Sequence, residues 1–399
     1  MSRYFISRPR EKAKISLPVK CLAIYFALMP FDSFPVFGMG SLLKVIALLP
    51  LGAIIILRKQ TSIRINKLTA AFIIYIIFNA LTCIYSVNLS ASWYSLRRLL
   101  LNGVLIIAVG GMNKTYSKEE FQYLLKALIL GGLATVILTL LFADTATEGR
   151  LTLSINGTKQ DQNYINGYMF FAFSFFVEKL VAQKKWLYTI PSLLLIVFTL
   201  LTGSRGALLA LVMLGVMILL FNLANTGKLK PEVILIACAL FALILLSSDY
   251  ILSLLPQEVA ERFSGEYIAN YKGLNRNALW KRLLVIFYDG NLFRRLFGYG
   301  YGTVAAVNSF NHMVAHNMWL EHLISGGYIG VVILTYMFAV FGIEAWKNKN
   351  AIVFASYMGY LMMCVTLSIT NYKPLWNSMM MIMISYNVRT DENLSERGE

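Results

Sequence analysis

Long runs of apolar residues, separated by short polar connections, recur along almost the whole chain. A helix needs about 20 mostly apolar residues to cross the hydrocarbon core of a bilayer. The pattern therefore predicts an all-α polytopic membrane protein with about twelve transmembrane helices. The predicted spans are 17–36, 41–57, 68–87, 97–112, 123–143, 164–182, 187–202, 205–224, 232–248, 316–342, 351–370 and 373–388.

One polar stretch interrupts this alternation. Residues 247–315 contain no apolar run of membrane length, and they lie between the ninth and tenth predicted spans. No boundary of a soluble domain and no internal repeat is evident elsewhere. We therefore expect a single integral membrane domain over residues 1–399, with 247–315 as one large external loop inside it.

Composition agrees with a membrane protein. The chain is 58% hydrophobic and 14% charged, whereas about 25% of the residues of a soluble protein are charged. The net charge of +16 would suit nucleic acid. However, lysine and arginine also collect in the cytoplasmic loops of membrane proteins and contact anionic lipid head groups. Because no zinc-finger spacing or RNA-binding signature accompanies the charge, we expect membrane lipid as a partner and no nucleic acid.

The sequence offers no metal-binding pattern. The cysteines Cys21, Cys83, Cys238 and Cys364 lie in apolar runs, far apart and without the spacing of metal ligands. We interpret them as small hydrophobic side chains rather than as disulfides or a zinc site. No Asp-x-Asp pair and no external cluster of carboxylates suits magnesium. The sequence therefore predicts neither a metal ion nor a cofactor.

Basic residues cluster in every second connection between the predicted spans. These connections lie on the same side of the membrane as the basic N-terminus. By the positive-inside rule, both termini are cytoplasmic, and the connection 144–163 and the loop 247–315 are external. Arg97 and Arg98 are an exception, because they sit at an outer end. The basic residues of the cytoplasmic connections are Arg58, Lys59, Arg64, Lys67, Lys114, Lys118, Lys179, Lys184, Lys185, Lys228, Lys230, Lys347 and Lys349.

Arg205 is a candidate anion-binding residue at the outer end of the eighth predicted span. Ser204 can cap the helix that begins at Gly206. The free N–H groups of a helix start attract anions, and a guanidinium binds phosphate through two hydrogen bonds. We therefore expect a phosphate seat here. The alternative is that Arg205 has no ligand and lies at the end of its helix, where its long side chain places the charge at the membrane surface.

The external connections supply further candidates. Arg276 lies in the large loop beside Trp280 and close to other basic residues. It is either a second phosphate ligand or part of a solvated basic amphipathic segment. Arg150 and Asn163 lie in the connection 144–163, on the same predicted face of the membrane.

His316 begins the tenth predicted span and is followed by Asn317. A helix N-terminus and nearby arginine charges both disfavour the imidazolium ion. His316 is therefore expected to be neutral near pH 7 and available as a general base. His312, one helical turn earlier, either shares the site or is a plain loop residue. The alternative for His316 is a capping or packing role. We expect Glu321 and His322, which are deeper, to form hydrogen bonds with neighbouring helices.

These elements together resemble the superfamily of O-antigen ligases and O-antigen polymerases. The likeness covers roughly residues 150–345. Gln162 stands where relatives often carry proline. The elements that carry the resemblance are Gly157-Thr158…Asp161-Gln162-Asn163, Ser204-Arg205-Gly206, Arg276…Trp280 with Phe297-Gly298-Tyr299-Gly300, and His316-Asn317…Leu320-Glu321…Gly327…Gly330.

The resemblance implies a glycosyltransferase of the bacterial inner membrane, with its active site on the external face. Such an enzyme transfers a glycan from undecaprenyl pyrophosphate to an acceptor hydroxyl, without a metal and with inversion. Arg205 and Arg276 would hold the donor pyrophosphate, and His316 would accept the proton of the hydroxyl. The substrate-binding residues would be Ser204, Asn317, Trp280, Arg150, Asn163 and His312.

Several functions remain open. A polymerase would extend a glycan on another lipid-linked repeat unit, whereas a ligase would attach the glycan to lipid A core. We favour polymerisation because the aromatic and amide-rich stretch Tyr267–Asn277 suits a sugar acceptor. A flippase for lipid-linked oligosaccharides or a structural scaffold would also fit the span number. Transporters tend to place polar groups at the midplane and to have related halves, and neither is evident here.

Overall fold

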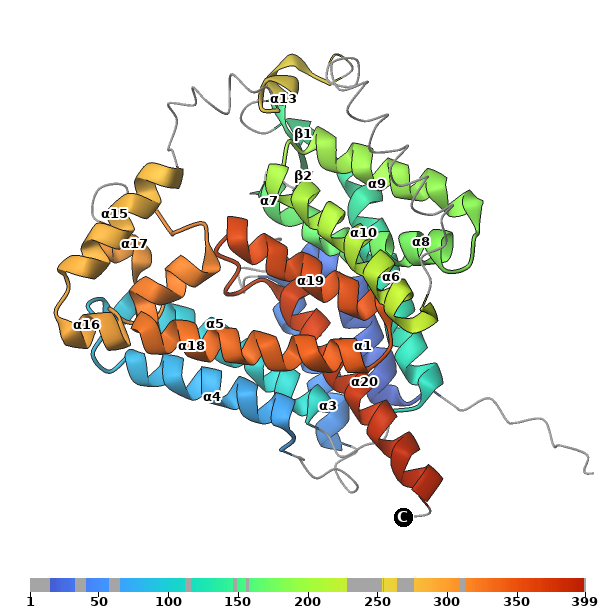
Figure 1. Cartoon of the computed structure of the whole chain (residues 1–399), viewed down its shortest axis with the longest axis horizontal. Coiled ribbons are helices and arrows are strands. Elements are labelled where there is room, and N and C mark those ends of the chain that lie inside the picture. The colour runs from blue at the N-terminus through green and yellow to red at the C-terminus, as the bar shows by residue number, and fades with distance from the viewer. Residues whose placement is uncertain are drawn as a thin grey trace, which may run out of the picture.

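The computed structural model describes residues 15–32, 41–56, 65–111, 116–145, 149–155, 158–227, 253, 255–263, 276–308 and 313–397. The predicted span 232–248, His312, Cys238 and most of Tyr267–Asn277 lie outside these residues. Cys21, Cys83 and Cys364 carry free thiols, and the last two are buried. The described chain is mainly helical, as expected (Figure 1).

Helices occupy the positions of all the predicted spans that fall within the described residues. In chain order they are α1 (Leu17–Ala27), η1 (Met29–Phe31), α2 (Leu42–Ile46), α3 (Leu48–Ile56), α4 (Lys67–Thr82), α5 (Leu89–Gly110), α6 (Lys118–Leu141), α7 (Gln162–Ile165), η4 (Asn166–Met169), α8 (Phe170–Val181), η5 (Trp186–Tyr188), α9 (Thr189–Leu201), α10 (Arg205–Thr226), α18 (Met318–Lys347), α19 (Ala351–Thr366) and α20 (Lys373–Arg397). Four of them, α5, α6, α10 and α18, are long and apolar enough by length and composition to cross a membrane. The fold is that of an all-α, multi-pass membrane protein, and the total of twelve spans stays a prediction.

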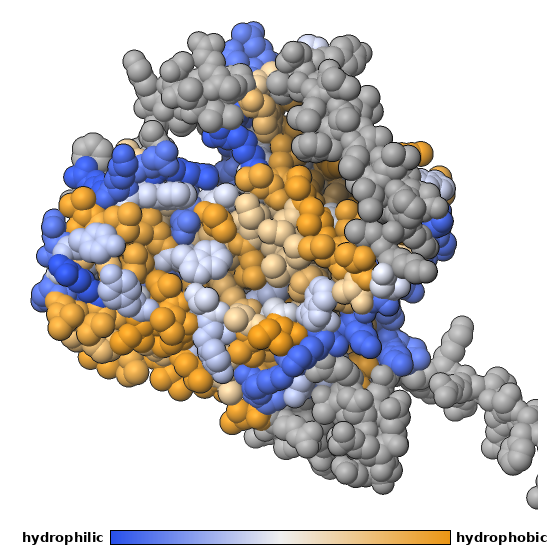
Figure 2. All heavy atoms as spheres, in the orientation of Figure 1, coloured by the Kyte–Doolittle hydropathy of each residue, from blue (hydrophilic) through white to orange (hydrophobic). Residues whose placement is uncertain are grey.

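The surface supports this assignment. Figure 2 shows a broad apolar area on the part of the molecule where Figure 1 places α4 and α18. Ile77 and Leu81 on α4 are each 53% exposed, and Val332 on α18 is 66% exposed. A soluble protein rarely exposes such a continuous apolar area, whereas a face that contacts lipid tails does.

Helix α20 lies in the core of the bundle. Its residues 375–384 are all buried. The indole of Trp376 meets the rings of Phe72 and Tyr75 on α4, with centroid distances of 5.6 and 6.3 Å. A helix that is apolar on all sides belongs in the interior of a bundle.

The large loop is itself partly helical. Its described helices are α13 (Gln257–Glu261), α15 (Arg276–Asp289), α16 (Leu292–Phe297) and α17 (Val304–Val307). Leu283 and Phe287 of α15 are fully buried in a small core that also contains Ile324 of α18. Figure 1 shows α15, α16 and α17 grouped around the start of α18.

Helix α18 is broken at Gly327, where φ is 64° and ψ is −163°. A Cβ atom at this position would lie 2.4 Å from the carbonyl carbon of Leu296. The N–H groups of Tyr299 and Gly300 donate to the carbonyls of Ile324 and Ser325, each at 2.9 Å. The sequence predicts one continuous span here, but the structure has two helical segments. Because loop backbone satisfies the carbonyls at the break, the irregular backbone is tolerated.

A small antiparallel sheet, absent from our sequence prediction, follows α6. Its strands are β1 (Ala143–Thr145), β2 (Leu151–Ile155) and β3 (Thr158–Lys159), in the order β1-β2-β3. Thr152 and Leu153 of β2 are fully buried. The amide of Gln160 donates to the carbonyl of Pro30 at 2.7 Å and ties the sheet to η1. The sheet thereby fixes both ends of the connection that carries Arg150 and Asn163.

Candidate active site

The turn between α9 and α10 presents Arg205. Gly203 has φ +62°, a conformation that glycine adopts at little cost. The hydroxyl of Ser204 accepts a hydrogen bond from the N–H of Ala207 at 3.4 Å, so the predicted capping of this helix is confirmed. A Cβ atom on Gly206 would lie 2.5 Å from Oγ1 of Thr366, so α10 and α19 approach closely here. Arg205 is thus the first residue of a tightly packed helix.

Two further arginines hold this turn from outside. Nε of Arg150 donates to the carbonyl of Thr202 at 2.8 Å, and its Nη2 donates to Oδ1 of Asn163 at 2.9 Å. Nε of Arg262, which follows α13, donates to the carbonyl of Gly203 at 3.3 Å. Arg150 and Asn163, predicted to bind substrate, therefore contact each other and the backbone that positions Arg205.

Arg276 is the first residue of α15 and is exposed. Partial loss of solvent and the charges of Arg205 and Arg262 lower the pKa of Arg276, while Asp161 acts in the opposite direction. A guanidinium nevertheless stays protonated throughout the physiological range. Arg205 and Arg262, from distant parts of the sequence, therefore both lie within electrostatic range of Arg276.

This group of cations suits an anion with several oxygens. Arg205 and Arg262 each repel Arg276, and the carboxylate of Asp161 offsets part of that repulsion. A bound phosphate or pyrophosphate would relieve the repulsion and accept paired hydrogen bonds from the guanidinium groups. The first turn of α10 adds the positive end of a helix dipole. The arrangement is therefore chemically suited to a diphosphate.

His316 lies beside this group. It has φ +50°, a left-handed conformation that non-glycine residues rarely adopt. Its Nδ1 atom is buried and has no hydrogen-bond partner among the described residues. Burial and the charge of Arg276 lower the pKa of His316 below its usual value of 6.5, against a weaker opposite effect of Asp161. The imidazole is therefore neutral at pH 7, in the direction predicted from the sequence.

The residue before His316 is fixed by both of its backbone groups. The indole Nε1 of Trp280 donates to the carbonyl of Ala315 at 2.8 Å. The N–H of Ala315 donates to Oε2 of Glu321 at 2.8 Å, and this oxygen also accepts from the hydroxyl of Ser368 at 2.8 Å. A left-handed conformation costs a non-glycine residue roughly 1–2 kcal/mol and persists only where its surroundings impose it. Trp280 and Glu321 provide that constraint.

Asn317 fixes the start of α18. Its Oδ1 accepts from the N–H of Leu320 at 3.0 Å, and its Nδ2 donates to the carbonyl of Val365 at 3.0 Å. Asn317 was predicted to bind substrate, but both of its polar groups contact the protein. Together with Glu321, it holds the two sides of His316.

His322 belongs to a separate buried network. Its Nδ1–H donates to the carbonyl of Met318 at 2.8 Å, so Nε2 accepts from the hydroxyl of Tyr75 at 2.8 Å. The prediction of hydrogen bonds with neighbouring helices is confirmed for His322, which contacts Tyr75 of α4. Glu321 instead accepts from Ser368, in the connection that follows α19.

The glycine run before α17 packs the loop against the bundle. Gly298, Gly300 and Gly302 have φ values of 77°, 113° and 75°. A Cβ atom on Gly298 would lie 2.3 Å from the carbonyl carbon of Ser325, and one on Gly302 would lie 2.0 Å from Oγ of Ser95. These glycines therefore allow close packing against α18 and α5.

Two residues of the site, Arg262 and Asp161, lie in external segments of interest but were given no role from the sequence. Arg262 is one of several basic residues in the large loop, and no local pattern distinguishes it from the others. Asp161 caps α7 by accepting from the N–H of Asn163 at 2.7 Å, and it also acts on His316. Its place two residues before Asn163, in a segment already of interest, was the available signal.

No family model matches this chain, and no curated protein matches it. The chain is similar to a solved structure that concerns the coordination of polymerization and crosslinking by a peptidoglycan synthase complex. The TM-score is 0.49 at 14% sequence identity, over 82% of this chain and 97% of that chain. A likeness of this size assigns neither a family nor an activity.

Proposed function

We propose that this protein is a membrane glycosyltransferase of the O-antigen polymerase and ligase type. It transfers a glycan from undecaprenyl pyrophosphate to an acceptor hydroxyl, without a metal ion. One observation carries the proposal: Arg205 acts electrostatically on Arg276, and Arg276 in turn acts on a neutral His316. A diphosphate seat beside a general base is what this reaction requires.

The chemical step follows from these roles. The acceptor hydroxyl oxygen attacks the anomeric carbon of the donor sugar, and His316 takes the hydroxyl proton. The bond between the anomeric carbon and the phosphate oxygen breaks, and undecaprenyl pyrophosphate leaves with the bonding electrons. Attack opposite to the leaving group inverts the anomeric centre. Arg205 and Arg276 stabilise the negative charge that develops on the leaving oxygen.

The supporting residues have positioning roles in this proposal. Arg150, Asn163 and Ser204 hold the turn that carries Arg205, and Trp280 and Asn317 hold the segment that carries His316. Arg262 joins the arginines of the diphosphate seat, because its charge also acts on Arg276.

The decisive experiment is a transfer assay with purified protein and a lipid-linked repeat unit, with and without lipid A core. A ladder of products from the repeat unit alone identifies a polymerase, and a single adduct on the core identifies a ligase. We expect a ladder, and we expect it to persist in excess chelator. Movement of the repeat unit across proteoliposomes without any new glycosidic bond would identify a transporter and contradict the proposal.

A further inference from the structure

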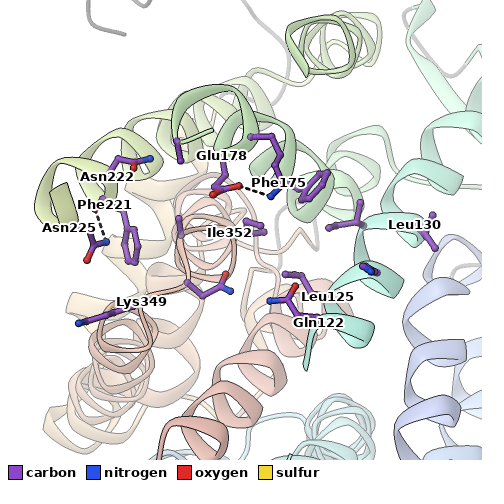
Figure 3. A pocket seen from close by; sticks show the side chains of 16 residues that line it. Gln122, Leu125, Leu130, Phe175, Glu178, Phe221, Asn222, Asn225, Lys349 and Ile352 are labelled. Atoms are coloured by element: carbon purple, nitrogen blue, oxygen red, sulfur yellow. Dashed lines mark hydrogen bonds and ion pairs between the residues drawn. The ribbon is translucent and has the colours of Figure 1, made fainter. Parts of the chain in front are cut away.

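A second candidate site lies at the opposite end of α10 from Arg205. It is a cavity of about 480 Å³ between α6, α8, α10 and the start of α19 (Figure 3). The cavity adjoins the end of the bundle that we predict to be cytoplasmic. It is separate from Arg205 and His316, which are at the other ends of α10 and α18.

The cavity has a basic rim. Lys126 of α6 and Lys349, which precedes α19, both line it and are both exposed. Lys179 also lines it, but its Nζ lies 3.6 Å from Oε2 of Glu178. Lys126 and Lys349 therefore give the rim its excess positive charge.

The start of α19 adds to this charge. Asn350 caps the helix by accepting from the N–H of Val353 at 3.0 Å, and Asn350, Ala351 and Ile352 all line the cavity. The first N–H groups of a helix have no partner within the helix and carry a partial positive charge. Lys349 directly precedes this start. The rim at this point thus has the features of a phosphate site.

One carboxylate oxygen in the cavity has an ion-pair partner but no hydrogen bond. Oε2 of Glu178 is buried and makes no hydrogen bond within the described part of the chain, and Nζ of Lys179 lies 3.6 Å from it. Figure 3 shows Glu178 extending from its helix towards the interior of the cavity. A buried acceptor without a donor is costly. A ligand that donates a hydrogen bond next to its phosphate would satisfy it.

The walls change from polar to apolar over about one helical turn. On α6, Ile129 and Leu130 lie one turn deeper than Lys126. On α8, Phe175 lies one turn deeper than Glu178. Leu130 is 61% exposed on the outer surface, so this wall continues into the lipid-facing side of the bundle. A charged rim above apolar walls matches a phospholipid, with its head group at the rim and its acyl chains below.

We propose that this cavity binds an anionic glycerophospholipid of the phosphatidylglycerol type from the cytoplasmic leaflet. Its phosphate pairs with Lys126, Lys349 and the start of α19. A glycerol hydroxyl donates to Oε2 of Glu178, and the acyl chains lie against Ile129, Leu130 and Phe175. Because the rim has more lysines than carboxylates, a lipid with a net negative charge fits better than a zwitterionic one. This proposal is independent of glycan transfer.

The test is native mass spectrometry of the full-length chain in detergent, titrated with phosphatidylglycerol or phosphatidylcholine of the same acyl chains. The wild type is expected to retain phosphatidylglycerol preferentially and to melt at a higher temperature in its presence. Replacing Lys126→Gln and Lys349→Gln together should weaken this binding by roughly tenfold or more. The matched control is Lys184→Gln with Lys185→Gln, which removes two exposed charges at the same end but outside the cavity.

Three outcomes would overturn the proposal. Equal retention of phosphatidylcholine would show that charge is not recognised. An equal loss of binding in the control variant would point to diffuse attraction of the basic surface. Displacement of the lipid by inorganic phosphate at an equal concentration would indicate an anion site rather than a lipid site. An unchanged melting temperature of the lipid-free variant checks that the substitutions preserve the fold.

Discussion

The indole N–H of Trp280 lies 2.8 Å from the carbonyl oxygen of Ala315 and donates to it. This contact joins α15 of the large loop to the residue that precedes His316. It also explains how a segment outside the membrane helices controls the position of the proposed base. In the proposed reaction, the side chain of Trp280 therefore positions His316 and does not itself take part in the chemical step.

Replacing Trp280 by phenylalanine tests this alignment. Trp280→Phe keeps an aromatic ring but removes the donor to Ala315, which is worth about 1 kcal/mol. We expect kcat to fall by about fivefold, with KM for the lipid-linked donor unchanged. The control is Trp319→Phe, which removes a 3.3 Å bond to Oγ1 of Thr335 on the same helix. If both variants lose activity equally, Trp280 has no special positioning role.

His316 can be tested with two small replacements. Both His316→Ala and His316→Gly remove the base and should lower transfer by roughly 10²–10⁴-fold. The two should differ in stability, because glycine adopts φ +50° without strain and alanine does not. We expect His316→Gly to melt at a higher temperature than His316→Ala. Normal glycan chain lengths in either variant would exclude the catalytic role.

The arginines are tested by a change that keeps their charge. Arg205→Lys and Arg276→Lys retain a cation but lose the planar pair of donors that matches a phosphate. Each should lower kcat/KM by roughly 10²-fold, the cost of losing an electrostatic donor at a reacting oxygen. Arg282→Lys, on the same helix as Arg276, should be active. Full activity of Arg205→Lys and Arg276→Lys would show that the phosphate is held by charge attraction alone and not by paired hydrogen bonds.

The pH profile should report the neutral state of His316. Because burial and Arg276 lower the pKa of His316, kcat/KM should be level at pH 7 and fall only below pH 6.5. Asp161 raises this pKa, so Asp161→Asn should shift the fall to still lower pH. Asparagine also caps helices well, which preserves α7. Asp289→Asn at the far end of α15 is the control, and a fall centred above pH 6.5 would contradict the assignment.

The break in α18 makes a prediction about stability. Gly327→Ala places a methyl group 2.4 Å from the backbone of Leu296 at a positive φ, so it should lower the melting temperature by several degrees. Gly215→Ala is the matched control, because a Cβ atom there has no neighbour within 4 Å and α10 is regular at that point. Equal melting of the two variants would show that the break is not required.

The helices of the bundle were predictable, because each predicted span is a long apolar run, whether the helix faces lipid or, like α20, the core. The break in α18 was not, since glycine is frequent in unbroken membrane helices and Gly326-Gly327 alone does not distinguish the two cases. Strands β1 and β3, of three and two residues, are too short for a periodic pattern to reveal. The apolar–polar alternation of β2, Leu151–Ile155, was an available signal that our prediction did not use. Their pairing depends on contacts such as that of Gln160 with Pro30, which lie far apart in the sequence.

The candidate site was predictable only where the local sequence carries a signal. Arg205 and His316 stand at helix starts, where the local sequence already indicates anion binding and a low pKa. The relation of Arg262 to the Gly203 turn depends on how α13 folds back, and no local pattern encodes that. For Asn317 and Trp280, the sequence indicates polar groups near the site. Only the structure reveals that those groups contact Val365 and Ala315.

The break at Gly327 also has a consequence for biogenesis. The outer segment of α18 obtains backbone partners from Tyr299 and Gly300, which precede it in the chain. In the topology that we predict, these residues reach the outer face only after the loop 247–315 has been translocated. Alignment of His316 would then be a late step of assembly. A freshly inserted chain would pass through a stage in which its helices cross the bilayer but its proposed base is not yet aligned.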